Sequence, residues 1–385
     1  MIIGIDGYEA NVAERVGVGR YAYEILKQMF QEVKSQKSKV KSFQELEFRI
    51  YLPDQPLPDL PQEAEWWKYI VAGPKKLWTF VGLPLAIAAD KRPDVFFSPT
   101  HYIPRFINIP RVFSIMDVSY LEFPGLFKAK DLHQLVQWTK YSVDHAAKIL
   151  TISGFSRNAI IKAYGVPEDR VIVTYPGLTM NSKVKRQKSK VLEQYGISNP
   201  YILSVGTLQP RKNFVRLIEA FSRVFKDLES KYPDITLVIV GKKGWLYEEI
   251  LSSPEKYGVS DRVKFLDFVP DDGLPDFYSN ALCFVLPSLY EGFGLPVLEA
   301  MAYKLPVIVS DVSSLPEIAG QAGIYVRPDS VDSIAEGLVK AIKEKGSPAE
   351  KKRIELGLTQ AKKFTWEKAA RKTLEILEEV GGNKY

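Results

Sequence analysis

Short apolar runs alternate with longer stretches of helical periodicity along the whole chain. In the first half, apolar runs predict strands at Ile2–Ile5, Phe48–Leu52, Val95–Phe97, Val112–Ile115 and Ile149–Ile152, with helices near Gly19–Val33 and Leu132–Ala147. The second half repeats this order, with strands at Tyr201–Val205, Thr236–Val240, Val263–Leu266, Cys283–Leu286 and Val307–Val309, and a helix at Phe214–Phe225. Such alternation is typical of parallel sheets covered by helices. We therefore expect two doubly wound α/β domains.

The composition between the two halves predicts a domain boundary. Residues 175–198 contain Pro176, Gly177 and the basic run KVKRQKSK, which suits a linker. We expect an N-terminal Rossmann-like domain at 1–180, a linker at 181–199 and a C-terminal domain at 200–363. Residues 364–385 read as an amphipathic helix, with Trp366 and Leu374 on its apolar face, that packs back across the boundary.

Length and composition fit this division. With 385 residues the chain is too long for one ordinary core, and its 46% hydrophobic and 25% charged residues are globular values. A net charge of +6 suits phosphate-bearing ligands or an anionic membrane surface, but it is too small to indicate nucleic acid. Cys283 is the only cysteine, which excludes an intrachain disulfide and favours a reducing compartment such as the cytoplasm.

Neither a signal peptide nor a membrane-spanning segment is expected. The longest apolar stretch, Leu77 to Ala89, is interrupted by Gly82 and Pro84 and falls short of the roughly 20 residues that a spanning helix needs. Four lysines between Lys34 and Lys41 could dock the protein on an anionic membrane, or could form a solvated basic loop.

The richest chemical signal lies in Pro287 to Asp311, where Glu291 and Glu299 bracket a Gly-Phe-Gly-Leu-Pro turn. Glycines in this turn allow tight geometry, and the proline suits the first turn of a helix whose free amide groups attract hydroxyls or anions. Two carboxylates beside such donors fit a polyhydroxyl ligand, such as a sugar joined to a nucleotide. The alternative is that Glu291 caps the helix and Glu299 is solvated.

A second signal follows the predicted strand Tyr201–Val205. The stretch Gly206 to Asn213, GTLQPRKN, places Arg211 and Lys212 at the carboxyl end of that strand, where open α/β sheets bind ligands. The two cations would clamp a diphosphate there. They could also be ordinary surface charges.

The N-terminal half offers less specific signals. Gly17 and Gly19 form a Gly-x-Gly-x-x-Ala pattern too far from the first strand for a dinucleotide fingerprint, so they form a phosphate-facing loop or a plain helix start. His101 and Asp117 follow predicted strands and face the expected ligand edge, although either could be structural. No Asp-x-Asp pair or His-Glu-x-x-His motif is present, so the sequence gives no argument for a metal.

With these motifs in place, the chain resembles the retaining glycosyltransferases of family 4 over nearly its whole length. The resemblance rests on Glu291 to Glu299 in EGFGLPVLE, on Gly206 to Asn213, and on the loop Gly17 to Gly19, in the family's order. It implies a GT-B fold, in which two Rossmann-like domains face each other across a cleft and the last helix crosses back to the N-terminal domain.

The resemblance also implies roles for individual residues. Arg211 and Lys212, after Gly206, would bind the donor diphosphate, and Glu299 the ribose hydroxyls. Glu291, with the backbone of Phe293, Gly294 and Leu295, would position the transferred sugar. Gly17 and Gly19 would approach the phosphate from the other domain. Related sequences often have His-Asp where this chain has Met116-Asp117, so the contact of that histidine is absent or passes to His101.

The function implied is transfer of a hexose from a nucleotide-diphosphate sugar to a glycan or lipid-linked acceptor, with retention, front-face attack and no metal. GDP-mannose is the favoured donor, followed by UDP-glucose or another UDP-sugar. The alternatives are a nucleotide-sugar epimerase of similar fold and a non-catalytic nucleotide-sugar-binding protein. The enzyme is expected in the cytoplasm, with contact to the inner face of the membrane as a further option.

Overall fold

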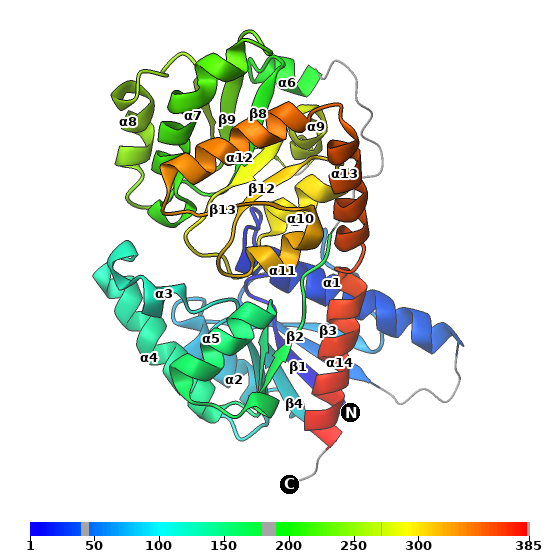
Figure 1. Cartoon of the computed structure of the whole chain (residues 1–385). Helices are drawn as coiled ribbons and strands as arrows, with labels where there is room; N and C mark the ends of the chain where they lie inside the picture. Colours follow the sequence, from blue (N-terminus) through cyan, green and yellow to red (C-terminus); the bar gives the residue numbers. More distant parts are fainter. Residues whose placement is uncertain (40–45, 179–189, 271, 383–385) are drawn as a thin grey trace. The chain divides into compact units, whose positions relative to one another are not determined.

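The computed structural model describes residues 1–39, 46–178, 190–270 and 272–382. The chain divides into two compact units, each built around its own parallel sheet (Figure 1). Unit 1 comprises Met1–Pro124, Lys128–Gly177 and Thr365–Tyr385, and unit 2 comprises Gly125–Phe127 and Leu178–Phe364.

Unit 1 contains a seven-stranded sheet in the order β3-β2-β1-β4-β5-β6-β7, in which all pairs are parallel. Its strands are β1 (Ile2–Asp6), β2 (Glu47–Leu52), β3 (Trp67–Val71), β4 (Val95–Ser98), β5 (Arg111–Ile115), β6 (Lys148–Thr151) and β7 (Val171–Val173). Its helices are α1 (Val18–Lys39), the π-helical turn η1 (Trp78–Gly82), α2 (Leu83–Ala88), α3 (Ser119–Glu122), α4 (Ala129–His145), α5 (Gly154–Tyr164), the 3₁₀ turn η3 (Glu168–Arg170) and α14 (Trp366–Gly382). A further 3₁₀ turn, η2, spans Pro124–Leu126.

Unit 2 contains a six-stranded parallel sheet in the order β10-β9-β8-β11-β12-β13. Its strands are β8 (Tyr201–Val205), β9 (Thr236–Val240), β10 (Val263–Leu266), β11 (Phe284–Leu286), β12 (Val307–Ser310) and β13 (Ile324–Val326). Its helices are α6 (Lys190–Gln194), η4 (Pro210–Lys212), α7 (Phe214–Glu229), α8 (Glu248–Lys256), α9 (Leu274–Asn280), α10 (Leu295–Ala302), α11 (Leu315–Ala319), η5 (Gly320–Ala322), α12 (Val331–Glu344) and α13 (Pro348–Ala361).

The core of unit 2 is formed by the apolar faces of its helices and by its central strands. Helix α7 buries Phe214, Leu217, Ile218 and Phe221 at helical spacing, and α12 buries Ile334 and Leu338 against the same face of the sheet. Alternate residues of the central strands complete this layer, so the sheet edge that carries the loops after β8 and β11 rests on a rigid base.

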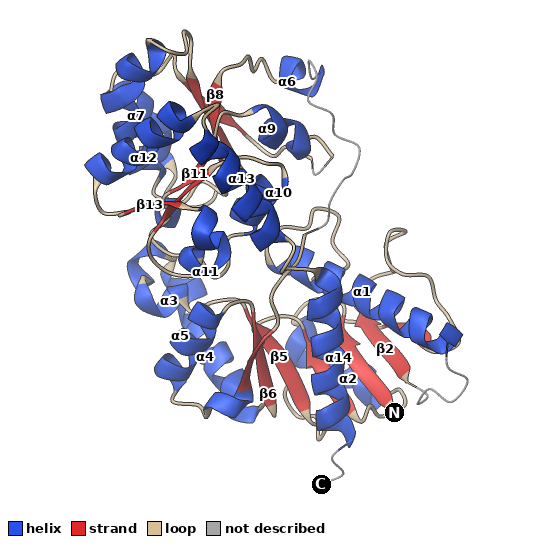
Figure 2. Ribbon diagram, turned by 45° about the vertical axis from the view of Figure 1, so that its right-hand side comes forward, coloured by secondary structure: helices blue, strands red, loops and turns tan. Residues whose placement is uncertain are grey.

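The final helix belongs to unit 1. Helix α14 packs against α1, β4 and β6, and Figure 2 shows it lying over the strands of that unit. Its buried Trp366 lies 6.1 Å from the ring of Tyr21 on α1. The chain therefore leaves unit 1 after Gly177 and returns to it at Thr365.

Every strand expected from the sequence is present within one or two residues of its predicted bounds, and the expected two-domain doubly wound α/β class is confirmed. Three strands, β3, β7 and β13, were not predicted. The expected linker at 181–199 is wrong in its second half, because Lys190–Gln194 forms helix α6, which buries Leu192 and packs against α9. Its first half lies outside the described residues.

The structure also bears on the expected membrane-spanning segment and on the lysines expected at a membrane surface. Among the described helices, none is long and apolar enough to cross a bilayer. Of the four lysines expected at a membrane surface, Lys34 lies over the ring of Phe30 at 5.8 Å and Lys37 over that of Trp66 at 5.7 Å. Lys41 and the side chain of Lys39 lie outside the described part of the chain.

Candidate functional site

The order of strands in unit 2 brings its two sequence motifs together. Strand β8 is followed by β9 on one side in the sheet, whereas β11 is followed by β12 on the other, so the direction of winding reverses between β8 and β11. Loops that leave the carboxyl ends of two such strands diverge and leave a ligand crevice. These two loops carry Arg211 and Lys212 after β8, and Glu291 after β11.

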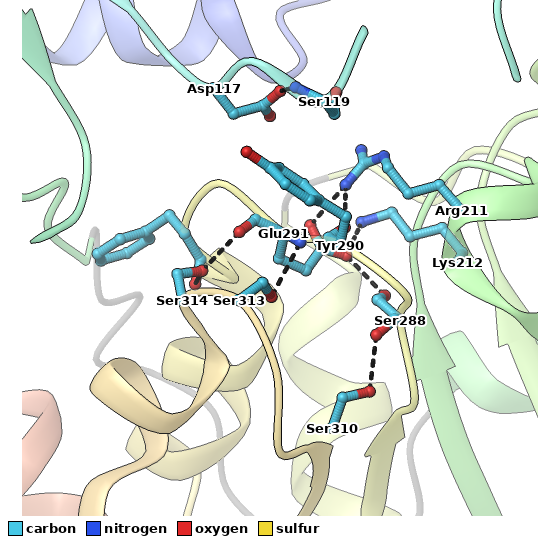
Figure 3. A network of polar contacts seen from close by, with 11 residues as sticks. Asp117, Ser119, Arg211, Lys212, Ser288, Tyr290, Glu291, Ser310, Ser313 and Ser314 are labelled. Carbon is cyan, nitrogen blue, oxygen red and sulfur yellow. Dashed lines mark hydrogen bonds and ion pairs between the residues drawn. The ribbon is translucent and has the colours of Figure 1, made fainter. Parts of the chain in front are cut away.

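Glu291 forms the centre of a charged cluster at this switch point (Figure 3). One carboxylate oxygen accepts a hydrogen bond from the Lys212 ammonium at 2.6 Å and another from the Ser288 hydroxyl at 2.7 Å. The other oxygen lies 3.1 Å from the Arg211 guanidinium, which also donates to the carbonyl of Tyr290 at 2.5 Å. Two cations therefore face one anion, and the cluster retains a net positive charge.

This environment fixes the ionisation of Glu291. Only 6% of the residue is exposed, and burial alone would raise the pKa of its carboxyl group. The charges of Lys212 and Arg211, with the hydrogen bonds from Lys212 and Ser288, outweigh that burial and lower the pKa to about 2. At neutral pH Glu291 is ionised and is a very weak base.

The backbone around Glu291 is held by serine hydroxyls from the loop after β12. The amide of Glu291 donates to the Ser313 hydroxyl at 3.1 Å. The Ser314 hydroxyl lies within hydrogen-bonding distance of the carbonyls of Glu291, at 2.9 Å, and Phe293, at 2.8 Å. Figure 3 shows Ser313 and Ser314 side by side along this segment. The carboxylate is thus presented from a fixed turn.

Asn213 fixes the loop that carries the two cations. Its backbone is left-handed, with φ of 63°, and its buried amide donates to the carbonyls of Pro287 at 2.9 Å and Pro328 at 2.7 Å. This residue therefore ties the loop after β8 directly to the loop after β11. Gly206, at the start of the former loop, leaves room for Lys212, because a Cβ atom there would lie 3.2 Å from Lys212 Cε.

Helix α10 begins as its sequence predicts. Gly294 precedes it with φ of 104°, and a Cβ atom at this position would lie 2.7 Å from Leu315 Cδ2, so glycine is needed for both conformation and space. Leu295 opens the helix with a proline beside it. The Phe293 side chain is buried and packs edge-on against Phe364 at 5.6 Å, so only its backbone is available to a ligand.

Glu299, one turn into α10, has a different setting. It is half-buried, and one of its carboxylate oxygens accepts a hydrogen bond from the Tyr278 hydroxyl at 2.8 Å. The Tyr278 ring stacks on Tyr303 with 5.8 Å between centroids and 4° between planes. The two glutamates of the motif are therefore held by different partners, Glu291 by cations and Glu299 by a tyrosine.

Comparison with known proteins assigns the family. The sequence profile of the group 1 glycosyl transferases matches residues 187–357. The O-antigen chain mannosyltransferase B of Escherichia coli is 32% identical over 289 residues, which cover 74% of each chain. The chain belongs to the group 1 glycosyltransferases.

Solved structures share the fold of this glycosyltransferase. Sucrose-phosphate synthase from Thermosynechococcus elongatus superposes with a TM-score of 0.74 at 16% identity and covers 100% of both chains. The Anabaena protein Alr3699/HepE, solved in complex with UDP-glucose, superposes with a TM-score of 0.68 at 17% identity over 98% of this chain and 99% of its own. These similarities confirm the GT-B fold expected from the sequence.

The residues of the N-terminal half that the sequence suggested for the site lie in unit 1. His101 follows β4, and its buried Nε2 atom accepts a hydrogen bond from the Met116 amide at 3.4 Å. Burial lowers the pKa of His101 although the charge of Asp117 acts in the opposite direction, so the ring is neutral at pH 7. Asp117 follows β5 and accepts a hydrogen bond at 2.9 Å from the amide of Ser119, the first residue of the short helix α3.

The glycine loop of unit 1 opens helix α1. Gly17 has φ of 51°, and its carbonyl accepts the amide of Tyr21 at 3.0 Å. Gly19 lies in the first turn of the helix, where a Cβ atom would lie 3.1 Å from the carbonyl oxygen of Glu9. The close approach seen at Gly19 is thus to the backbone of its own unit.

A buried carboxyl group at the end of β1 was not singled out in the sequence. Asp6 accepts hydrogen bonds from the Trp78 indole at 2.9 Å and from the Tyr8 amide at 3.1 Å. Burial raises its pKa to about 6 in spite of these bonds. The available signal was a charged residue at the end of the first apolar run, followed by Gly7.

Among the described residues, no group of three or more His, Cys, Asp or Glu side chains is arranged to hold a metal ion.

The serines and Asn213 that hold the Glu291 turn were also missed in the sequence. A hydroxyl or amide side chain gives little signal in a sequence, and Ser313 comes 22 residues after Glu291.

Proposed function

We propose that this glycosyltransferase transfers mannose from GDP-mannose to a glycan or lipid-linked acceptor with retention of configuration. The observation that carries the proposal is the cluster of Arg211, Lys212 and Glu291 at the switch point of unit 2. Mannose is favoured because the relative that covers most of the chain at 32% identity is named a mannosyltransferase. UDP-glucose or another UDP-sugar is the second donor to test.

The two cations suit the diphosphate of such a donor. Lys212 and Arg211 are held close together by one carboxylate, so an incoming diphosphate would meet two cationic donors side by side. Their charge would also stabilise the departing nucleoside diphosphate, which is the task a divalent cation performs in metal-dependent transfer. We therefore propose that transfer needs no metal ion.

Glu291 is assigned to sugar positioning rather than to nucleophilic or base catalysis. A carboxylate with a pKa of about 2, hydrogen-bonded to an ammonium and a hydroxyl, accepts a proton poorly and has few free lone pairs for attack. In the proposed front-face reaction the acceptor oxygen bonds to the anomeric carbon on the side from which the leaving group departs. The leaving phosphate oxygen takes the acceptor proton.

The remaining assignments follow the resemblance. Glu299 would bind the ribose hydroxyls, and the hydrogen bond from Tyr278 would hold it in position. Gly17, Gly19, His101 and Asp117 are proposed to contribute from unit 1, with neutral His101 taking the place of the histidine replaced by Met116.

The first test addresses the phosphate site. Lys212→Ala should weaken the binding of GDP or UDP about 10- to 100-fold, because a hydrogen bond to a charged group contributes about 1.5–3 kcal/mol. Isothermal titration calorimetry measures this, with Lys340→Ala on the exposed face of α12 as the matched control. A folded Lys212→Ala variant with unchanged affinity would overturn the phosphate role.

The second test separates the two glutamates. Glu299→Ala should weaken the binding of the bare nucleotide, whereas Glu291→Ala should chiefly lower the rate of sugar transfer. Equal losses of bare-nucleotide affinity in both variants would show that this division of roles is wrong.

The donor and the reaction class are tested together. A thermal-shift screen of nucleotide sugars identifies the donor, since a ligand at 100 times its dissociation constant stabilises a fold by about 2.7 kcal/mol. An epimerase would convert the donor without an acceptor, and a non-catalytic protein would bind it without turnover. The family assignment favours transfer over both alternatives.

We also propose a cytoplasmic location with peripheral membrane contact. The only cysteine, Cys283, is buried, and burial raises the pKa of its thiol to about 12, which suits a packing role without redox chemistry. The lysines of α1 are a modest basis for membrane contact, because Lys34 and Lys37 lie over aromatic rings of their own unit.

A further inference from the structure

A segment of unit 1 that plays no part in the proposed chemistry exposes a row of large apolar side chains. Leu77, Val81 and Leu85 are 58%, 37% and 58% exposed. They are spaced four residues apart, and we name them the apolar strip: Leu77 directly precedes η1 with a left-handed backbone, Val81 lies in η1 and Leu85 lies in α2. Val81 and Leu85, at this spacing in consecutive helical turns, share one side of the segment, and Leu77 is exposed where the segment begins.

The opposite side of the same segment is firmly anchored. Trp78, Leu83, Ala86 and Ile87 pack in a core cluster with residues of β2 and β4. The Trp78 indole also donates to the buried Asp6 carboxylate at 2.9 Å. Gly82 permits this packing, because a Cβ atom there would lie 2.4 Å from the carbonyl oxygen of Pro74. The strip is therefore a preformed surface of the folded unit.

A fourth apolar side chain extends this surface. Phe106 is 93% exposed with φ of 60°. Its neighbour Arg105 places its guanidinium 5.3 Å from the ring of Phe80 on η1, and the guanidinium of Arg92, just beyond α2, donates to the carbonyl of Asn108. The loop that carries Phe106 thus lies alongside the segment that carries the strip.

Basic residues lie at both ends of the apolar strip. Lys75 and Lys76 precede it, Lys91 and Arg92 follow it, and all four are exposed; Lys75 pairs with Asp54 at 2.7 Å and Lys91 with Glu47 at 3.8 Å. The single acidic residue between them, Asp90, is bound to Arg49 at 3.0 Å and Tyr51 at 3.3 Å. Such a surface suits an anionic bilayer, because the exposed apolar side chains can enter the boundary of the acyl chains while the flanking cations contact the anionic headgroups.

We infer that the apolar strip, with Phe106 and the flanking basic residues, is the surface through which unit 1 docks on an anionic lipid bilayer. The segment would lie in the plane of the membrane, because it is far too short to span it. This inference is independent of the proposed donor chemistry, since docking needs no nucleotide.

The apolar strip and the lysines of α1 are two alternative membrane-docking surfaces, and they lie on different faces of unit 1. From β1 through α1 to β2 the chain moves toward the β3 edge of the sheet, whereas from β3 through α2 to β4 it moves toward the β7 edge. Because both crossovers are right-handed, α1 and α2 lie on opposite faces of the sheet. Packing agrees, because Tyr51 contacts the α2 cluster, whereas Phe48, an odd number of residues away on the same strand, packs with Trp67 beside Phe30 of α1. The inference selects the α2 face.

Vesicle co-sedimentation with the full chain tests this choice. The probe is unilamellar vesicles of phosphatidylcholine with and without phosphatidylglycerol. The wild type should bind the anionic vesicles, and a triple variant Leu77→Ser, Val81→Ser, Leu85→Ser should bind them at least tenfold more weakly. A matched control removes apolar side chains that are exposed elsewhere, Leu121→Ser and Leu246→Ser, and should bind as the wild type does.

Two charge variants separate the faces. Lys76→Gln with Lys91→Gln should lower binding to anionic vesicles by about fivefold per charge, whereas Lys34→Gln with Lys37→Gln should leave it unchanged. Equal binding of the triple variant and the wild type, or a loss confined to the α1 variant, would overturn the inference. So would a change in oligomeric state of the triple variant by light scattering, which would mark the strip as a contact between copies.

Measuring nucleotide binding by the same variants distinguishes a failure of the docking inference from a failure of the proposed function. The triple variant should bind GDP as tightly as the wild type in calorimetry, because its substitutions lie in unit 1 on exposed positions. Loss of vesicle binding with intact GDP binding supports the docking surface whatever the donor proves to be, and failure to bind GDP in the wild type would count only against the proposed donor.

Discussion

Replacing Glu291 by glutamine should show what the negative charge beside Lys212 and Arg211 contributes to the stability of unit 2. Glutamine has the shape of the native side chain and still accepts a hydrogen bond from the Lys212 ammonium or the Ser288 hydroxyl. It removes only the negative charge that faces Lys212 at 2.6 Å and Arg211 at 3.1 Å. The substitution therefore isolates the electrostatic part of the cluster.

The pKa of Glu291 sets the expected magnitude. It is about 2 in the folded protein against an ordinary value of 4.5, so ionisation of Glu291 stabilises the fold by about 3 kcal/mol at pH 7. Because the folded pKa is the lower one, this stabilisation is complete above pH 4.5 and is lost as the pH falls toward 2. At pH 3 about 1 kcal/mol remains.

Differential scanning calorimetry measures the effect. About 3 kcal/mol corresponds to a fall of roughly 6–12 °C in the melting temperature of a domain of this size at pH 7. The matched control is Asp332→Asn, whose carboxylate pairs with Arg223 at 2.6 Å but whose side chain is 78% exposed, so it should cost less than about 1 kcal/mol.

Two results would refute this reasoning. Glu291→Gln could melt with the wild type at pH 7, which would mean that the cluster contributes nothing net. The difference could instead be as large at pH 3 as at pH 7, which would mean that it arises from packing. GDP adds a further check, because its diphosphate should stabilise the variant more than the wild type.

Three other predictions concern single groups. Gly294→Ala should lower the stability of unit 2 by about 1–3 kcal/mol in thermal unfolding, because φ of 104° and the Leu315 side chain at 2.7 Å both oppose a Cβ atom. Asp6→Asn should raise the melting temperature at pH 7 and leave it unchanged near pH 4, since the folded pKa of about 6 exceeds the ordinary 3.8 and ionisation above it costs about 3 kcal/mol. Tyr278→Phe should weaken GDP binding severalfold by calorimetry without unfolding, because it removes the hydrogen bond to Glu299 while the ring keeps its stacking contact.

The alternation of apolar runs and helical spacing was enough to predict the fold class, because buried parallel strands are continuous apolar segments. The strands that were missed lack this signal. Strand β3, Trp67–Val71, mixes Lys68 with aromatic residues at the edge of its sheet, and β7 and β13 have only three residues each. Both of these short strands lie at a sheet edge and are only partly buried, whereas the equally short β11 (Phe284–Leu286) was predicted because it is fully buried and continues an apolar run from Cys283.

The candidate site, too, could be predicted only in part from the sequence. Arg211, Lys212 and Glu291 were found because they follow apolar strands, and strand order then brought them into contact. Which partner each would take was beyond the sequence, since the pairing of both cations with Glu291 depends on side-chain geometry across two loops. The apolar strip was visible only as an interrupted hydrophobic stretch, because its exposure depends on which side of η1 and α2 faces the core.

The return of the chain to unit 1 at Thr365 has a consequence for biosynthesis. Unit 1 lacks α14 until residues 366–382 have been synthesised, and the contacts of α1, β4 and β6 with that helix cannot form before then. Residues 178–364, by contrast, are all available before α14 emerges. The C-terminal unit can therefore finish folding on the ribosome first, although it is encoded second. A premature stop codon just before Trp366 would spare the C-terminal unit, for which nucleotide binding is proposed, and leave the N-terminal unit open to chaperones and proteases.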